Sequence, residues 1–144
     1  MTDESPGRHF RNLIHWQMGQ ELAVRVVKLA EELPRSRTSD LVVAQLVRSA
    51  GSVPANIAEG YGRYSKAAYR NHLSIARGSL FETQSWLDLL TRQSLISSEL
   101  AADLDRQCEE LARVLTAQMK ALEGGDGAIR EVGLAYEVDI EDER

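Results

Sequence analysis

The chain has one cysteine, few aromatic residues and no long apolar run, and each shortage excludes a class of protein. Cys108 is the only cysteine among 144 residues, so a disulfide within the chain, and with it a secreted disulfide framework, is excluded. No apolar run approaches the roughly 18 residues of a membrane helix, and we find no charged-then-apolar leader at the N-terminus. These absences predict a soluble, cytoplasmic protein with no membrane partner.

The residue patterns of common catalytic and metal sites are also missing. His9, His15 and His72 have no metal-ligand spacing with one another or with Cys108, and the Glu-x-x-His pair of a di-metal bundle is absent. The turn at residues 60–63 has neither the spacing nor the lysine of a phosphate-binding loop. We therefore predict no metal, no cofactor and no catalytic residues, and expect that the protein is not an enzyme.

What the sequence does contain is four amphipathic segments. Apolar residues recur at steps of three and four over residues 13–33, 42–57, 69–90 and 100–122. Four helices with one apolar stripe each, joined by short connectors, predict an all-α fold, an antiparallel up-down-up-down four-helix bundle. Thr38, Ser39 or Asp40 is the expected cap of the second helix. Pro54 falls inside that helix and should kink or divide it.

The negative charge of the chain is concentrated at its C-terminal end. The formal net charge is −5, but residues 123–144 hold eight acidic residues against two arginines, a net charge of −6. Residues 1–122 carry 15 basic and 14 acidic residues, so the overall acidity does not exclude a body that binds nucleic acid. We divide the chain into a flexible arm (1–9), a four-helix bundle domain (10–122) and an acidic C-terminal tail (123–144).

The acidic tail contains a short pattern of period two. Apolar residues alternate with acidic or small ones at Val132, Leu134, Tyr136, Val138 and Ile140, as in a strand. An all-helical domain offers a single strand no partner. The segment from Val132 to Ile140 therefore either stays disordered or docks as an extended peptide on a protein client.

The second predicted helix carries a polar stripe beside its apolar one. At 100° per residue, its members fall within about 80° of arc: Gln45, Arg48, Ser52, Asn56 and Glu59. The stripe is either a groove for a ligand or partner, or a structural feature, namely a solvated face or a hydrogen-bond network. Arg48 and Glu59 lie about 16 Å apart along a straight helix, so each needs another partner if it is buried. An enzymatic or small-ligand site in this stripe is the weaker alternative.

The third predicted helix carries a basic ridge. Arg63, Lys66, Arg70 and Arg77 lie within about 60° of arc, and Phe81 continues the line one turn further. Cations repeated along a rod suit the phosphate backbone of a nucleic acid, and an exposed aromatic ring can stack on a base. The alternative interpretation is a solvated face flanked by acidic partners.

Two strings carry a resemblance to a known family. Residues 45–63 are QLVRSAGSVPANIAEGYGR and residues 73–83 are LSIARGSLFET, and an aromatic start lies at residues 10–16. These features resemble the 23S rRNA intervening-sequence protein family, also called the four-helix bundle protein family, over about residues 10–122. The signature polar residues of that family fall here on Gln45, Arg48, Ser52, Asn56, Glu59, Arg63 and Glu82. Ser49 stands where the family usually has alanine, and the acidic tail is not part of its pattern.

The resemblance implies a fold and a kind of function. Members are similar in forming antiparallel four-helix bundles that assemble as rings, typically homopentamers. A related accessory protein of diversity-generating retroelements shares the bundle and the ring, and binds a reverse transcriptase and nucleic acid. The implied function is a non-catalytic oligomeric scaffold for RNA, DNA or a nucleic-acid enzyme such as a reverse transcriptase. The alternative is a protein–protein adaptor that recruits a client through its C-terminal tail.

Overall fold

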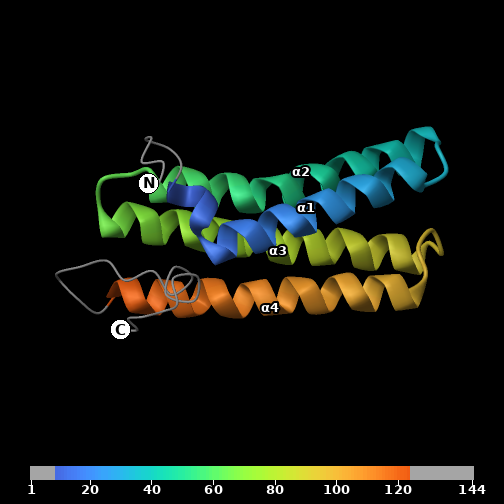
Figure 1. The fold of residues 1–144 in the computed structure, drawn as a ribbon. Coiled ribbons are helices and arrows are strands. Elements are labelled where there is room, and N and C mark those ends of the chain that lie inside the picture. The colour runs from blue at the N-terminus through green and yellow to red at the C-terminus, as the bar shows by residue number, and fades with distance from the viewer. Residues whose placement is uncertain (1–8, 124–144) are drawn as a thin grey trace.

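The computed structural model describes residues 9–123, which are helical apart from short connectors. The elements are a 3₁₀ helix, η1 (His9–Asn12), and the α-helices α1 (Ile14–Glu32), α2 (Arg37–Tyr61), α3 (Lys66–Arg92) and α4 (Ser98–Glu123). The α-helices lie side by side, and their connectors alternate between the two ends of the molecule (Figure 1). Four α-helices without a strand in residues 9–123 confirm the all-α prediction and agree with a four-helix bundle.

The amphipathic stripes of the sequence supply the core. Each α-helix turns one apolar stripe inward. Its side chains are almost fully buried in the core, among them Leu22, Val26, Leu46, Ile57, Leu73, Leu80, Leu104 and Leu115. Cys108 is fully buried among them, as expected for a small apolar filler. Burial, together with the negative charges of Asp105 and Glu109, raises the pKa of its thiol to about 12. The thiol is therefore protonated and poorly reactive near neutral pH.

Two helix boundaries differ from the sequence expectation. Ser36, not Thr38, Ser39 or Asp40, caps α2, and its Oγ accepts the backbone N–H of Ser39 at 3.0 Å. Asp40 is instead drawn to Arg35, with 2.9 Å between its Oδ1 and the guanidinium Nε. Helical structure starts at His9 and runs through Glu123, one residue beyond each end of the predicted bundle domain.

Pro54 does not divide α2, which is continuous from Arg37 to Tyr61. Proline removes one backbone hydrogen bond of the helix, here the one to the carbonyl of Ala50. Pro54 is buried against α1 at Gly19, where an added Cβ would lie 3.4 Å from the Cβ of Pro54. Because Gly19 has no side chain, α1 can pass close to the proline ring.

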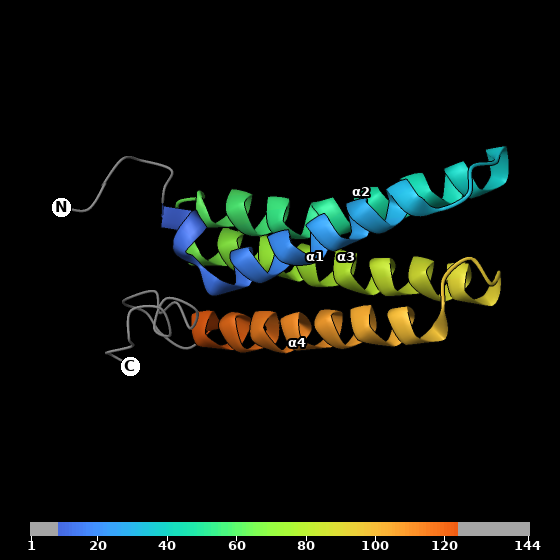
Figure 2. The same ribbon diagram turned by 45° about the vertical axis from the view of Figure 1, so that its right-hand side comes forward.

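The helices do not pair equally. The contact between α2 and α3 is the most extensive, and that between α1 and α4 is the smallest among the α-helices that pack together. Figures 1 and 2 show that α1 and α2 lean away from α4 toward the end that carries their connector. None of the helices in residues 9–123 combines the length and the apolar character needed to cross a membrane.

Candidate functional site

The polar stripe of α2 lies against α3 and forms a hydrogen-bonded row that we call the α2–α3 seam. The seam consists of Gln45, Arg48, Ser49, Ser52 and Asn56 from α2 and of His72, Ser79, Glu82, Thr83 and Trp86 from α3. The family signature included Gln45, Arg48, Ser52, Asn56 and Glu82, and the structure brings these side chains together in the seam.

The middle of the seam is buried and hydrogen-bonded. The hydroxyls of Ser49 and Thr83 lie 2.9 Å apart, and both side chains are fully buried. One turn further along α2, the hydroxyl of Ser52 lies 3.0 Å from that of Ser79. Each pair joins a hydroxyl of α2 to a hydroxyl of α3, so the pairs help to fix how the two helices register against each other. Ser49, the departure from the family's usual alanine, therefore has a partner in Thr83.

Asn56 extends the seam toward the end of α2. Its amide nitrogen donates to the backbone carbonyl and to the hydroxyl of Ser52, at 2.9 Å each. Its amide oxygen lies 3.2 Å from Nδ1 of His72 on α3. The side chain is thus held on both sides by groups of the same chain.

The charged ends of the seam are paired as well. Arg48 donates to Glu82 at 3.1 Å and to Gln45 at 3.0 Å, and the indole N–H of Trp86 donates to the same Glu82 carboxylate at 3.1 Å. Glu59 belongs to the α2 polar stripe but not to the seam, and it pairs with Arg63 one turn later, at 2.7 Å. Arg48 and Glu59 do not pair with each other, as their separation predicts. Internal partners along the whole seam support the structural interpretation of the stripe.

Several members of the basic ridge have a partner within the chain. Arg63 is held by Glu59 of α2. Arg70 faces α4, where its Nε donates to the backbone carbonyl of Met119 at 3.2 Å and its guanidinium pairs with Glu123 at 2.5 Å. Lys66 is half-buried at the start of α3. The guanidinium of Arg77 lies over the ring of Phe81, 4.9 Å from its centroid.

Arg77 and Phe81 form one wall of a hollow between α3 and α4, which we call the α3–α4 groove. It has a volume of about 450 Å³, and its other wall is α4, with Glu109, Arg113 and Lys120. Three cations thus face one carboxylate. The Nε of Arg77 is buried and has no hydrogen-bond partner among residues 9–123. The groove is an electropositive hollow with an aromatic side chain in its wall.

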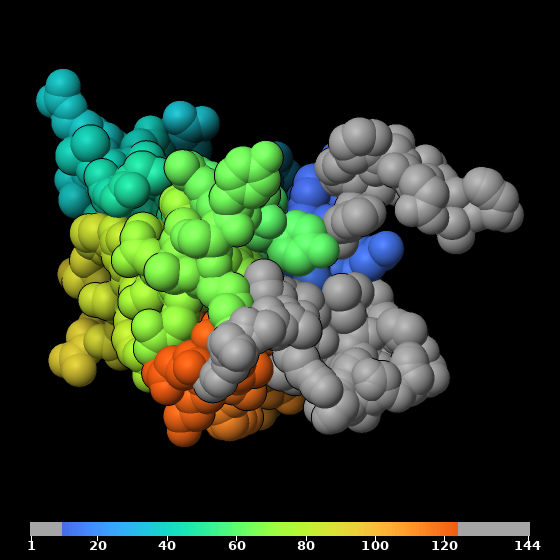
Figure 3. All heavy atoms as spheres, turned by 90° about the vertical axis from the view of Figure 1, so that its left-hand side faces the viewer, coloured from blue at the N-terminus to red at the C-terminus, as the bar shows by residue number. Residues whose placement is uncertain are grey.

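The charge of the α3–α4 groove changes along its length. At one end Gln84 donates to the carboxylates of Asp105 and Glu109, at 3.0 Å each. The basic part lies toward the other end, where Lys120 is one turn from the last residue of α4. Figure 3 looks onto that end and shows α4 (orange) directly against the green residues where α3 begins.

Sequence reasoning missed Arg113 and Lys120. They are seven residues apart on α4 and so share one face of the helix, next to its apolar stripe. That spacing is visible in the sequence. Its meaning depends on which neighbouring helix lies beside that face, and only the packing of α4 against α3 gives that information.

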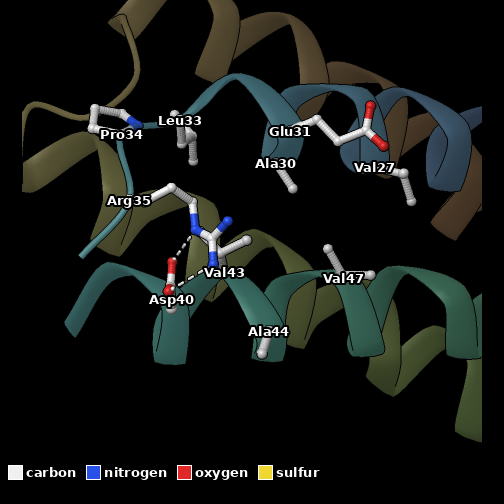
Figure 4. A pocket seen from close by; sticks show the side chains of 10 residues that line it. All are labelled: Val27, Ala30, Glu31, Leu33, Pro34, Arg35, Asp40, Val43, Ala44 and Val47. Atoms are coloured by element: carbon white, nitrogen blue, oxygen red, sulfur yellow. Dashed lines mark hydrogen bonds and ion pairs between the residues drawn. The ribbon is translucent and has the colours of Figure 1, made fainter. Parts of the chain in front are cut away.

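Two further hollows have charged groups that are already paired. The cleft between α1 and α2, of about 460 Å³, is lined by Val27, Val43 and Val47 and carries the Arg35–Asp40 ion pair (Figure 4). The hydrogen bond from Arg35 holds the pKa of Asp40 below its ordinary value.

The hollow between α1 and α4 is larger, at about 660 Å³. Its one cation, Arg25, donates to Gln107 at 2.7 Å and to Asp103 at 2.9 Å. Neither this hollow nor the α1–α2 cleft therefore presents an unpaired cation to a ligand. Residues 9–123 also contain no group of three or more His, Cys, Asp or Glu side chains that could hold a metal ion.

The fold and the site together define an all-helical bundle protein with an internally bonded polar seam and an electropositive groove. The chain belongs to the 23S rRNA-intervening sequence protein family, whose family model matches residues 11–117. This match confirms the resemblance carried by residues 45–63 and 73–83.

The fold is also similar to a solved structure. This is a crystal structure of a protein with unknown function from the S23 ribosomal protein family of Bacteroides thetaiotaomicron. It is 31% identical and superposes with a TM-score of 0.70, over 74% of this chain and 99% of that one. No curated protein matches the chain. The predicted docking peptide, Val132–Ile140, lies outside the described residues, and so does the predicted arm (1–9) except for His9.

Proposed function

We propose that this protein is a non-catalytic, oligomeric helical scaffold that binds RNA through the α3–α4 groove. The observation that carries the proposal is the arrangement of Arg77, stacked on Phe81, opposite Arg113 and Lys120. Cations on both walls of a hollow can neutralise successive phosphates of one strand. Phe81 is 44% exposed beside them, so a base can stack on its ring.

The spacing of the cations favours a polymer over a single phosphate group. Arg113 and Lys120 are separated by about 10 Å along α4, since each residue adds 1.5 Å. A nucleic-acid strand that follows the groove can contact both cations through successive phosphates. The family description names an intervening sequence of 23S rRNA, which supports RNA as the first choice over DNA.

Self-association would strengthen this binding. The proposed assembly is a homopentameric ring of up-down-up-down bundles, as the family resemblance implies. Exposed apolar side chains, such as Val24 and Val27 on α1 and Leu41 on α2, provide surface for subunit contacts. A ring would present several grooves at once and would convert weak individual contacts into avid binding. A reverse transcriptase bound to the same RNA, or a client of the adaptor kind, is compatible with such a scaffold.

Replacing the three groove cations by alanine tests the proposal. We expect the Arg77→Ala/Arg113→Ala/Lys120→Ala variant to bind a fluorescent single-stranded RNA 20-mer at least about tenfold more weakly at low salt. The slope of log affinity against log salt should fall by about 2, because three phosphate contacts are lost at about 0.7 each for a single strand. Fluorescence anisotropy between 50 and 300 mM salt measures both quantities.

The chain offers a control with the same change in charge. Arg37, Arg92 and Arg106 lie outside the groove, and the alanine variant of all three should retain the parental affinity to within about threefold. If both triple variants lost affinity equally, net charge rather than the groove would govern binding. If neither variant changed, or if the parent bound no RNA, the proposed function would be wrong.

A further inference from the structure

We infer that the α3–α4 groove is the docking site of this chain's own acidic segment, residues 131–143, which therefore excludes RNA from the groove. The docking is inferred from the charge and the position of the groove alone. Only its consequence, competition with RNA, rests on the proposed function.

The charges of the two surfaces are complementary. Between residues 131 and 143 the chain has six acidic side chains and no lysine or arginine. The groove offers the guanidinium groups of Arg77 and Arg113 and the ammonium group of Lys120, with Glu109 as its one carboxylate. The other two large hollows are less suited to an acidic peptide, because Arg35 and Arg25 are already paired with Asp40 and Asp103.

The acidic segment starts close to the basic part of the groove. Helix α4 ends at Glu123, and Lys120 lies one turn before it. Residues 124–130 include three glycines and span at most about 25 Å when fully extended. Arg113 is ten residues before Glu123, about 15 Å back along α4. The connecting residues are thus long enough for residues 131–143 to reach the groove without a change in the helices.

The first acidic residue of the predicted tail already makes such a contact. The carboxylate of Glu123 pairs with Arg70 across the boundary between α3 and α4. Docking of residues 131–143 would continue this row of contacts along the same two helices. Exposed ion pairs are individually weak, but a tether of seven residues gives an effective concentration on the order of millimolar. The contact is therefore expected within one chain and should weaken as salt rises.

A spin label on the acidic segment tests the docking without any RNA. In the full-length protein, Glu137→Cys can be labelled with a nitroxide, because the buried, protonated thiol of Cys108 reacts poorly. We expect the label to broaden amide resonances of Phe81, Arg113 and Lys120 more than those of Val27 and Val43 in the α1–α2 cleft. The excess broadening should disappear at high salt and in the Arg113→Glu/Lys120→Glu variant.

Two results would overturn the docking. One is equal broadening in the groove and the α1–α2 cleft. The other is equally strong groove broadening in isotope-labelled chains that carry no spin label themselves, once they are mixed with spin-labelled chains. The second result would place the segment on a neighbouring copy rather than on its own groove.

A second arm measures competition and separates this inference from the proposed function. Replacing all six acids of residues 131–143 by their amides should strengthen binding of the RNA 20-mer by about tenfold at low salt, since the groove is freed. Groove broadening without RNA binding in any variant would keep the docking and reject the proposed function. RNA binding without groove broadening would keep the proposed function and reject the docking. RNA binding that does not respond to the amide variant, despite groove broadening, would reject the competition.

Discussion

Lowering the pH from 7 to 5 is expected to reduce the free energy of unfolding by about 2 kcal/mol through one residue, His15. Its side chain is fully buried at the start of α1, where Nε2 lies 3.0 Å from the hydroxyl of Tyr69 on α3. Burial disfavours the charged imidazolium and lowers the pKa of His15 from 6.5 to about 4. The imidazole is therefore neutral in the folded protein at pH 5.

The sign follows from where the proton binds. Above pH 6.5 His15 is neutral in the folded and the unfolded protein, and its contribution to stability is fully present. Between pH 6.5 and about 4 the unfolded chain takes up a proton that the folded chain excludes, so stability falls as the pH falls. Below about 4 the folded protein is protonated as well, and this contribution levels off. The total loss over the whole range is about 3 kcal/mol.

Urea unfolding at several pH values measures this effect. The His15→Gln variant is the control, because it keeps a polar side chain but cannot titrate. We expect the parent to lose about 2 kcal/mol more than the variant between pH 7 and pH 5. Equal losses in the two proteins would show that other groups cause the pH dependence.

Replacing Gly60 by alanine is expected to destabilise the fold by about 1–3 kcal/mol, although alanine is the better helix former. A Cβ at Gly60 would lie 2.5 Å from the Cβ of His72 and 3.2 Å from Cδ1 of Tyr69, both on α3. The Cβ of His72 is fixed to the backbone, so the two helices must move apart. That movement would also pull His72 away from Asn56 and disturb the α2–α3 seam.

Gly78 provides the matched control. It is exposed within α3, and an added Cβ there would meet nothing within 4 Å. Gly78→Ala should therefore stabilise the protein by about 0.5–1 kcal/mol, through helix propensity alone. Thermal or urea unfolding of the two variants should give changes of opposite sign. A neutral or stabilising Gly60→Ala variant would mean that α2 and α3 are not closely packed at this point.

The role of Gly60 could not be predicted from the residues around it in the sequence. In the sequence alone, glycines such as Gly60 and Gly62 at the end of an amphipathic segment are typical signals for the end of a helix. Gly62 is indeed the residue after α2, but Gly60 lies inside the helix and is required by the approach of α3. A glycine near a helix end suits either role, and only the position of the neighbouring helix distinguishes them.

Only part of the candidate site could be predicted from the sequence, because the rest depends on which helices lie side by side. The polar stripe of α2 occupies one face of one helix, so periodicity alone groups its members. The family signature added Glu82 to this group. Ser79 and Thr83 are identified as partners of the stripe only by the packing of α3 against α2. Likewise, Arg77 and Phe81 belonged to the predicted ridge, but Arg113 and Lys120 lie on another helix.

The sequence by itself determined the four helices, the apolar face of each, the family and the uneven distribution of charge. These properties depend on residues within a few turns of one another, so a local period is sufficient to show them. The tertiary structure decided which polar faces meet, that Arg70 pairs with Glu123, and that a basic groove lies between α3 and α4. Such contacts join residues far apart in the chain, and they depend on the register of packed helices, which a period of 3.6 residues does not contain.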